Sequence, residues 1–100
     1  MTSFSNAYVD LSWLADAGAL DGVAEVLRER RRQLEEKGWT LAHDAQAHNA
    51  GKLMVMASQA AAQAYAGASD GTKDEAECER LMARSGALAA AEIDRVNGEL

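Results

Sequence analysis

The chain of 100 residues contains no proline, so glycine is its only strong helix breaker. Its eight glycines interrupt a sequence rich in alanine, leucine, glutamate and arginine, which are all good helix formers. The β-branched residues are few and scattered. We therefore expect an all-α fold that forms a single helical domain over residues 1–100.

Three segments have apolar residues at the three- and four-residue spacing of an amphipathic helix. This spacing predicts a small bundle of three main helices at about 21–37, 44–66 and 73–96. Residues 1–9 are expected to be irregular. A short N-terminal helix should follow them and end at Gly18, with Trp13 and Leu14 docked on the main body.

Local signals mark the ends of these helices. Lys37 followed by Gly38 is a typical helix stop, because a cation favours the helix C-terminus and glycine tolerates the left-handed conformation beyond it. The segment from Gly67 to Gly71 predicts a loop. After it, Thr72 and Glu75 have the spacing of a capping box at the start of the last helix.

The charge of the chain limits its partners. Its net charge of -6 argues against direct binding to nucleic acid, which requires a basic surface. The same charge is compatible with binding a partner whose basic surface normally holds nucleic acid, or it only keeps the protein in solution. A single cysteine, Cys78, excludes an internal disulfide and favours a cytosolic setting. We expect no membrane span and no signal peptide.

The only candidates for a catalytic or metal-binding set are His43, Asp44 and His48. Histidines four residues apart share one helix face and can bind a metal, but His43 and His48 are five residues apart. Asp44 is most simply explained as a helix N-cap. The chain also lacks a phosphate-binding glycine loop and a nucleophile elbow. We therefore predict no catalytic residue, no metal and no cofactor.

Two further features allow two interpretations each. The basic run over residues 28–32 is either the solvated face of a helix or a contact for an anion or an acidic partner. Trp39 follows the helix stop at Gly38. It either folds back as a hydrophobic anchor or stands at a rim, where it contacts a ligand or a partner.

Several motifs occur in order along the chain. They are ERRRQL at 29–34, GWT at 38–40, HD at 43–44 with His48, GKL at 51–53 and SGALAAAEIDR at 85–95. In this order they resemble a family of short phage and prophage proteins that has no settled activity. The resemblance covers roughly residues 29–66 and 81–96.

Three departures from the family pattern bear on function. Lys37 and Lys52 stand where the family usually has glutamates, and His43 and His48 are one residue further apart than usual. A short loop at 67–73 replaces an insert rich in tryptophan and proline. A family fold with an altered site implies binding rather than catalysis.

The sequence and the resemblance together favour a small acidic phage protein that inhibits a host defence complex, as anti-CRISPR proteins do. It would act in the cytoplasm of the host bacterium by blocking a basic nucleic-acid-binding surface. The residues expected to contact this partner are acidic, with one tryptophan: Glu35, Glu36, Trp39, Asp74, Glu75, Glu77 and Glu79.

Two alternatives remain open. One is a nucleotide-binding or metal-dependent hydrolase-like protein that uses His43, Asp44 and His48. The other is a structural homodimer with its seam on the alanine-rich helix.

Overall fold

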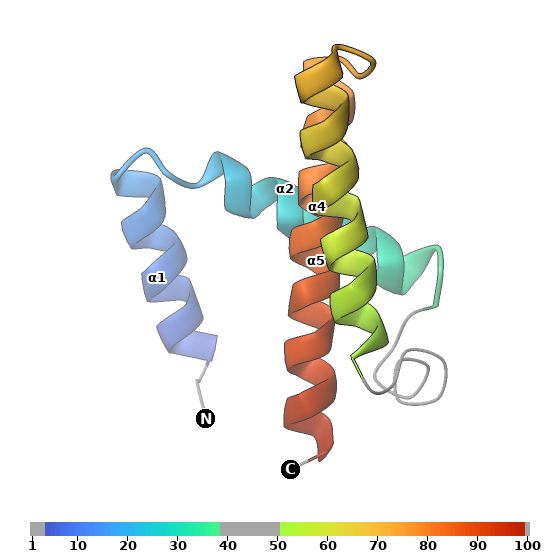
Figure 1. Cartoon of the computed structure of the whole chain (residues 1–100). Coiled ribbons are helices and arrows are strands. Elements are labelled where there is room, and N and C mark those ends of the chain that lie inside the picture. Colours follow the sequence, from blue (N-terminus) through green and yellow to red (C-terminus); the bar gives the residue numbers. More distant parts are fainter. Residues whose placement is uncertain (1–3, 39–50, 100) are drawn as a thin grey trace.

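The computed structural model describes residues 4–38 and 51–99 of the chain. Within these ranges all regular structure is helical, which confirms the predicted all-α bundle with an additional N-terminal helix (Figure 1). The helices are α1 (Phe4–Asp16), α2 (Asp21–Glu35), α4 (Lys52–Asp70) and α5 (Glu75–Glu99).

Helices α4 and α5 form an antiparallel hairpin (Figure 1). Its core is made mostly of small side chains on α4. The buried positions of α4 are alternately four and three residues apart, and all but the first are alanine or glycine: Leu53, Ala57, Ala60, Ala64 and Gly67. Short side chains let two helix backbones approach closely. Two polar groups of α5 consequently reach carbonyl oxygens of α4. Ser85 Oγ donates to Ala57 O at 2.9 Å, and Cys78 Sγ donates to Ala64 O at 3.7 Å.

Helix α2 crosses α5 on a different face from α4 (Figure 1). A Cβ atom built at Gly86 of α5 would lie 2.8 Å from Cγ2 of Val26, so glycine is what permits this crossing. Arg30 Nη2 lies 3.4 Å from Asp94 Oδ2, which joins the two helices further along. Among the described residues, α5 is therefore the helix that packs against two others.

The predicted bounds of the alanine-rich helix are only partly correct. Gly51 has a positive φ of 83° and α4 begins after it, while residues 44–50 lie outside the described ranges. At its other end α4 continues through Gly67 to Asp70, beyond the predicted end at 66. Gly67 packs closely against the side chain of Lys73 instead of breaking the helix. The turn comes at Gly71, where φ is 73°.

The predicted capping box is wrong by two residues. Asp74 Oδ1, not Thr72, accepts the backbone N–H at the start of α5, from Glu77 at 2.8 Å. Thr72 instead donates its N–H and its hydroxyl to Asp70 Oδ1, at 2.9 and 2.6 Å. These hydrogen bonds stabilise the carboxylate and are the main reason why the pKa of Asp70 lies below its ordinary value.

The prediction for the N-terminal helix is wrong in two respects. Helix α1 begins at Phe4, within the segment expected to be irregular, although it ends before Gly18 as predicted. It also packs against none of the other described helices. Trp13, expected to dock on the body, is 68% exposed. Within the described ranges, no helix combines the length and the apolar character needed to cross a bilayer.

The close approach at Gly86 gives a testable prediction. Replacing a helix-interior glycine by alanine normally stabilises a helix by about 1 kcal/mol. We expect Gly86→Ala to lower the free energy of unfolding in the native background, because the added methyl meets Val26. In a Val26→Ala background the same change should raise it. Urea unfolding of the four proteins of this double-mutant cycle measures the effect of Gly86→Ala on the free energy of unfolding in each background. Equal effects in both backgrounds would contradict the close approach of Val26 to Gly86.

Candidate functional site

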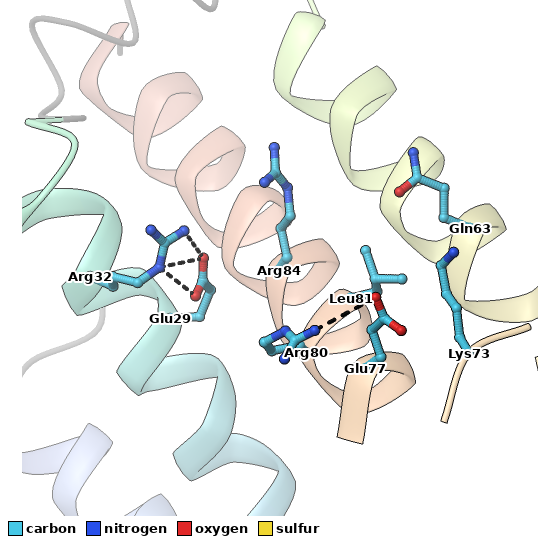
Figure 2. A pocket seen from close by; sticks show the side chains of 8 residues that line it. All are labelled: Glu29, Arg32, Gln63, Lys73, Glu77, Arg80, Leu81 and Arg84. Atoms are coloured by element: carbon cyan, nitrogen blue, oxygen red, sulfur yellow. Dashed lines mark hydrogen bonds and ion pairs between the residues drawn. The ribbon is translucent and has the colours of Figure 1, made fainter. Parts of the chain in front are cut away.

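A charged groove lies over α5, between α2 on one side and α4 with the α4–α5 turn on the other (Figure 2). Its volume is about 400 Å³. Eight residues from the three helices and the α4–α5 turn line it: Glu29, Arg32, Gln63, Lys73, Glu77, Arg80, Leu81 and Arg84. Four of these side chains are cations and two are carboxylates, so the lining is basic although the chain is acidic.

Two of the four cations are held by carboxylates of their own helix (Figure 2). Arg32 binds Glu29 at 2.6 Å through Nη2 and at 2.9 Å through Nε. This hydrogen bonding is the main reason why the pKa of Arg32 is raised. Arg80 Nη2 lies 3.8 Å from Glu77 Oε1, a longer and largely exposed contact. Arg32 is consequently fixed more firmly than Arg80.

Lys73 and Arg84 form no ion pair with any described residue. The aliphatic part of Lys73 packs against Gly67 in the space that a side chain would fill. The positive charge of Lys73 also contributes, as a minor cause, to the lowered pKa of Asp70. Arg84 is exposed on α5, four residues after Arg80. The groove therefore presents two cations that no carboxylate of the described residues binds directly.

The predicted acidic contact residues have distinct local roles. Glu35 accepts a hydrogen bond from Arg31 at 2.8 Å, which raises the pKa of that arginine, and Glu36 lies 3.6 Å from Arg32. Asp74 caps α5, and Glu77 lines the groove. The two other acidic residues, Glu75 and Glu79, are exposed in the first turns of α5 and form no ion pair with a described residue.

The other sequence candidates, Trp39, His43, Asp44 and His48, lie outside the described residues. Within the described ranges, no three histidine, cysteine, aspartate or glutamate side chains are grouped as metal ligands.

Sequence reasoning missed a set of buried polar residues. Gln33 is 0% exposed, and neither its Oε1 nor its Nε2 has a hydrogen-bond partner within the described part of the chain. Glu92 is 7% exposed and pairs with Arg95, which donates from Nε at 2.9 Å. The position of Gln33 in the sequence could have revealed its burial. It follows Arg30 by three residues, so both lie on the same face of α2, and Arg30 contacts α5.

One contact between helices joins two of the motif segments, ERRRQL at 29–34 and SGALAAAEIDR at 85–95. Arg30 and Gln33 belong to the first segment, and Glu92, Asp94 and Arg95 belong to the last. The Arg30–Asp94 contact joins the two. Comparison of the chain with protein-family models, with curated proteins and with solved structures found no match.

Proposed function

We propose that this chain is a phage-encoded binding protein that inhibits a host defence complex by covering a basic, nucleic-acid-binding surface. The observation that carries this proposal is that helix α1 is left without a packing partner among the described helices. It has an apolar surface, yet it packs against no other described helix. Val9 is 66% and Trp13 is 68% exposed on it.

A helix of this kind needs a partner. Isolated helices of 13 residues are marginal in water, and most helices in proteins are stabilised by packing an apolar face. Exposed tryptophan is costly to hydrate and is enriched among the residues that dominate binding energy at interfaces. Burial of Trp13 and Val9 against another protein would stabilise α1 and the complex together.

The charge distribution supports a basic partner. The net charge of -6 gives long-range attraction to a positive surface and speeds encounter with it. Glu75 and Glu79 are exposed and form no ion pair with a described residue, so their carboxylates can contact a partner directly. Glu35 and Glu36 are already paired with arginines of α2, so they contribute less. The resemblance to phage proteins supports a host defence complex as the class of target.

The test begins with affinity capture from a host bacterial lysate. We expect the native chain to capture a nucleic-acid-binding complex, and added DNA or RNA to release it. With the purified complex, Trp13→Ala should weaken binding by about 2 kcal/mol, which is roughly 30-fold. Because Trp13 contacts no other described helix, the melting temperature of the free protein should stay unchanged.

Two double variants with equal charge change provide the control. Glu75→Gln with Glu79→Gln should reduce both the affinity and its dependence on salt more than Glu35→Gln with Glu36→Gln does. Capture of no nucleic-acid-binding complex, or of one that nucleic acid does not displace, contradicts the proposal.

A second candidate, the homodimer, is favoured by the outward face of α4. Between Lys52 and Asp70 this helix carries no charged residue, although Met54, Val55 and Tyr65 are each more than half exposed on it. A surface helix normally has a charged or polar outer face. Two copies with the same negative charge can approach most easily through an uncharged face.

Light scattering at micromolar concentration tests this candidate. The native chain should have the mass of two chains. Val55→Glu combined with Tyr65→Glu should have the mass of one, because the charges would oppose each other across the two-fold axis. Ala76→Glu, on an exposed position of α5, serves as the matched control and should remain dimeric. A monomeric native chain would rule the homodimer out.

A further inference from the structure

We propose that the charged groove between α2, α4 and α5 binds the phosphate chain of a small polyanion, such as pyrophosphate or the triphosphate of a nucleotide (Figure 2). This site is separate from α1 and from the outer face of α4, and the proposal does not depend on the binding function proposed for them.

The first argument is the concentration of charge. Four of the ten lysines and arginines line this one groove, together with only two of the sixteen acidic residues. The lining therefore has an excess of two positive charges in a chain whose net charge is -6. At physiological ionic strength charges are screened over about 8 Å, so an anion in the groove interacts mainly with the charges that line it, in which cations outnumber carboxylates.

The second argument is that several of these cations are positioned before a ligand arrives. Lys73 has its aliphatic stem packed against Gly67, and the Glu29 carboxylate holds Arg32 in place. Figure 2 shows Lys73 beside Gln63 at the α4 side of the groove, opposite the Arg32–Glu29 pair on α2. Because these side chains are already ordered, binding loses less conformational entropy than it would with freely moving side chains.

The chemistry of the lining selects the ligand. Guanidinium groups bind phosphate oxygens through two parallel hydrogen bonds, and lysine adds a point charge. The volume of about 400 Å³ is in the range of small-molecule sites. No aromatic side chain lines the groove, so a nucleotide base has no surface on which to stack. The phosphate chain, which carries several negative charges, is therefore the part that the groove recognises.

Isothermal titration calorimetry of the whole chain with pyrophosphate, without divalent metal, tests the proposal. We expect saturable binding by the native protein. Lys73→Gln combined with Arg84→Gln should weaken binding by about tenfold or more, since both cations without an ion pair to a described residue are lost. Arg31→Gln removes an exposed arginine of α2 that pairs with Glu35 and does not line the groove. It should change the affinity by less than about twofold.

A third variant is expected to gain affinity for pyrophosphate. Glu77→Gln removes a carboxylate from the groove and releases Arg80, while the backbone N–H of residue 77 still donates to the Asp74 cap. This variant should bind pyrophosphate more tightly than the native protein. Arg84→Gln alone, at an exposed position, provides a variant in which folding is not at risk, and circular dichroism verifies this for each protein.

Parallel titrations with ATP and AMP identify the recognised part of a nucleotide. ATP should bind about as tightly as pyrophosphate, and AMP more weakly. The proposal is overturned if pyrophosphate does not bind, if Arg31→Gln reduces affinity as much as the Lys73/Arg84 double variant, or if AMP binds as tightly as ATP.

Discussion

The close contact between α4 and α5 is the interaction on which the rest of the structure depends. It exists because α4 presents alanine and glycine at four of its five buried positions, so that Ser85 and Cys78 of α5 reach its carbonyl oxygens. Because these side chains are small, the core is thin. Leu53 and Leu88 are the only large apolar side chains that are fully buried among the described residues. Such a core cannot cover every apolar residue. Trp13 on α1 and Tyr65 on α4 consequently remain exposed, and these exposed surfaces are what support a binding function.

The charged groove depends on the same packing. Gly67 continues the row of small residues on α4, and its missing side chain leaves the space that the stem of Lys73 occupies. Gly86 lets α2 cross α5 closely, which brings the Arg32–Glu29 pair to the same groove as Arg84. Long cationic side chains therefore surround the edges of an interface whose centre is made of small ones. The geometry of the proposed anion site is a consequence of how closely α2 and α4 each approach α5.

The fold class could be predicted from the sequence because a proline-free chain of helix formers has few alternatives. The errors came where a residue type has two uses. Gly67 lies inside α4 as a packing residue and not in the predicted loop, and Asp74, not the predicted Thr72, caps α5. The groove could not be predicted, because Arg32, Gln63 and Arg84 come from three helices and meet only after the crossing angles are set. Buried Gln33 was missed because a polar residue is normally assigned to the surface.

A comparison of two alanines on the same helix tests the close contact most directly. Ala60 is 3% exposed and faces the core, whereas its neighbour Ala61 is exposed. Leucine is nearly as good a helix former as alanine, so propensity affects both positions alike. We predict that Ala60→Leu lowers the free energy of unfolding in urea by about 1–3 kcal/mol through overpacking, and that Ala61→Leu leaves it nearly unchanged. Equal effects of the two substitutions, or a more stable Ala60→Leu protein, would contradict the close approach of α4 to α5.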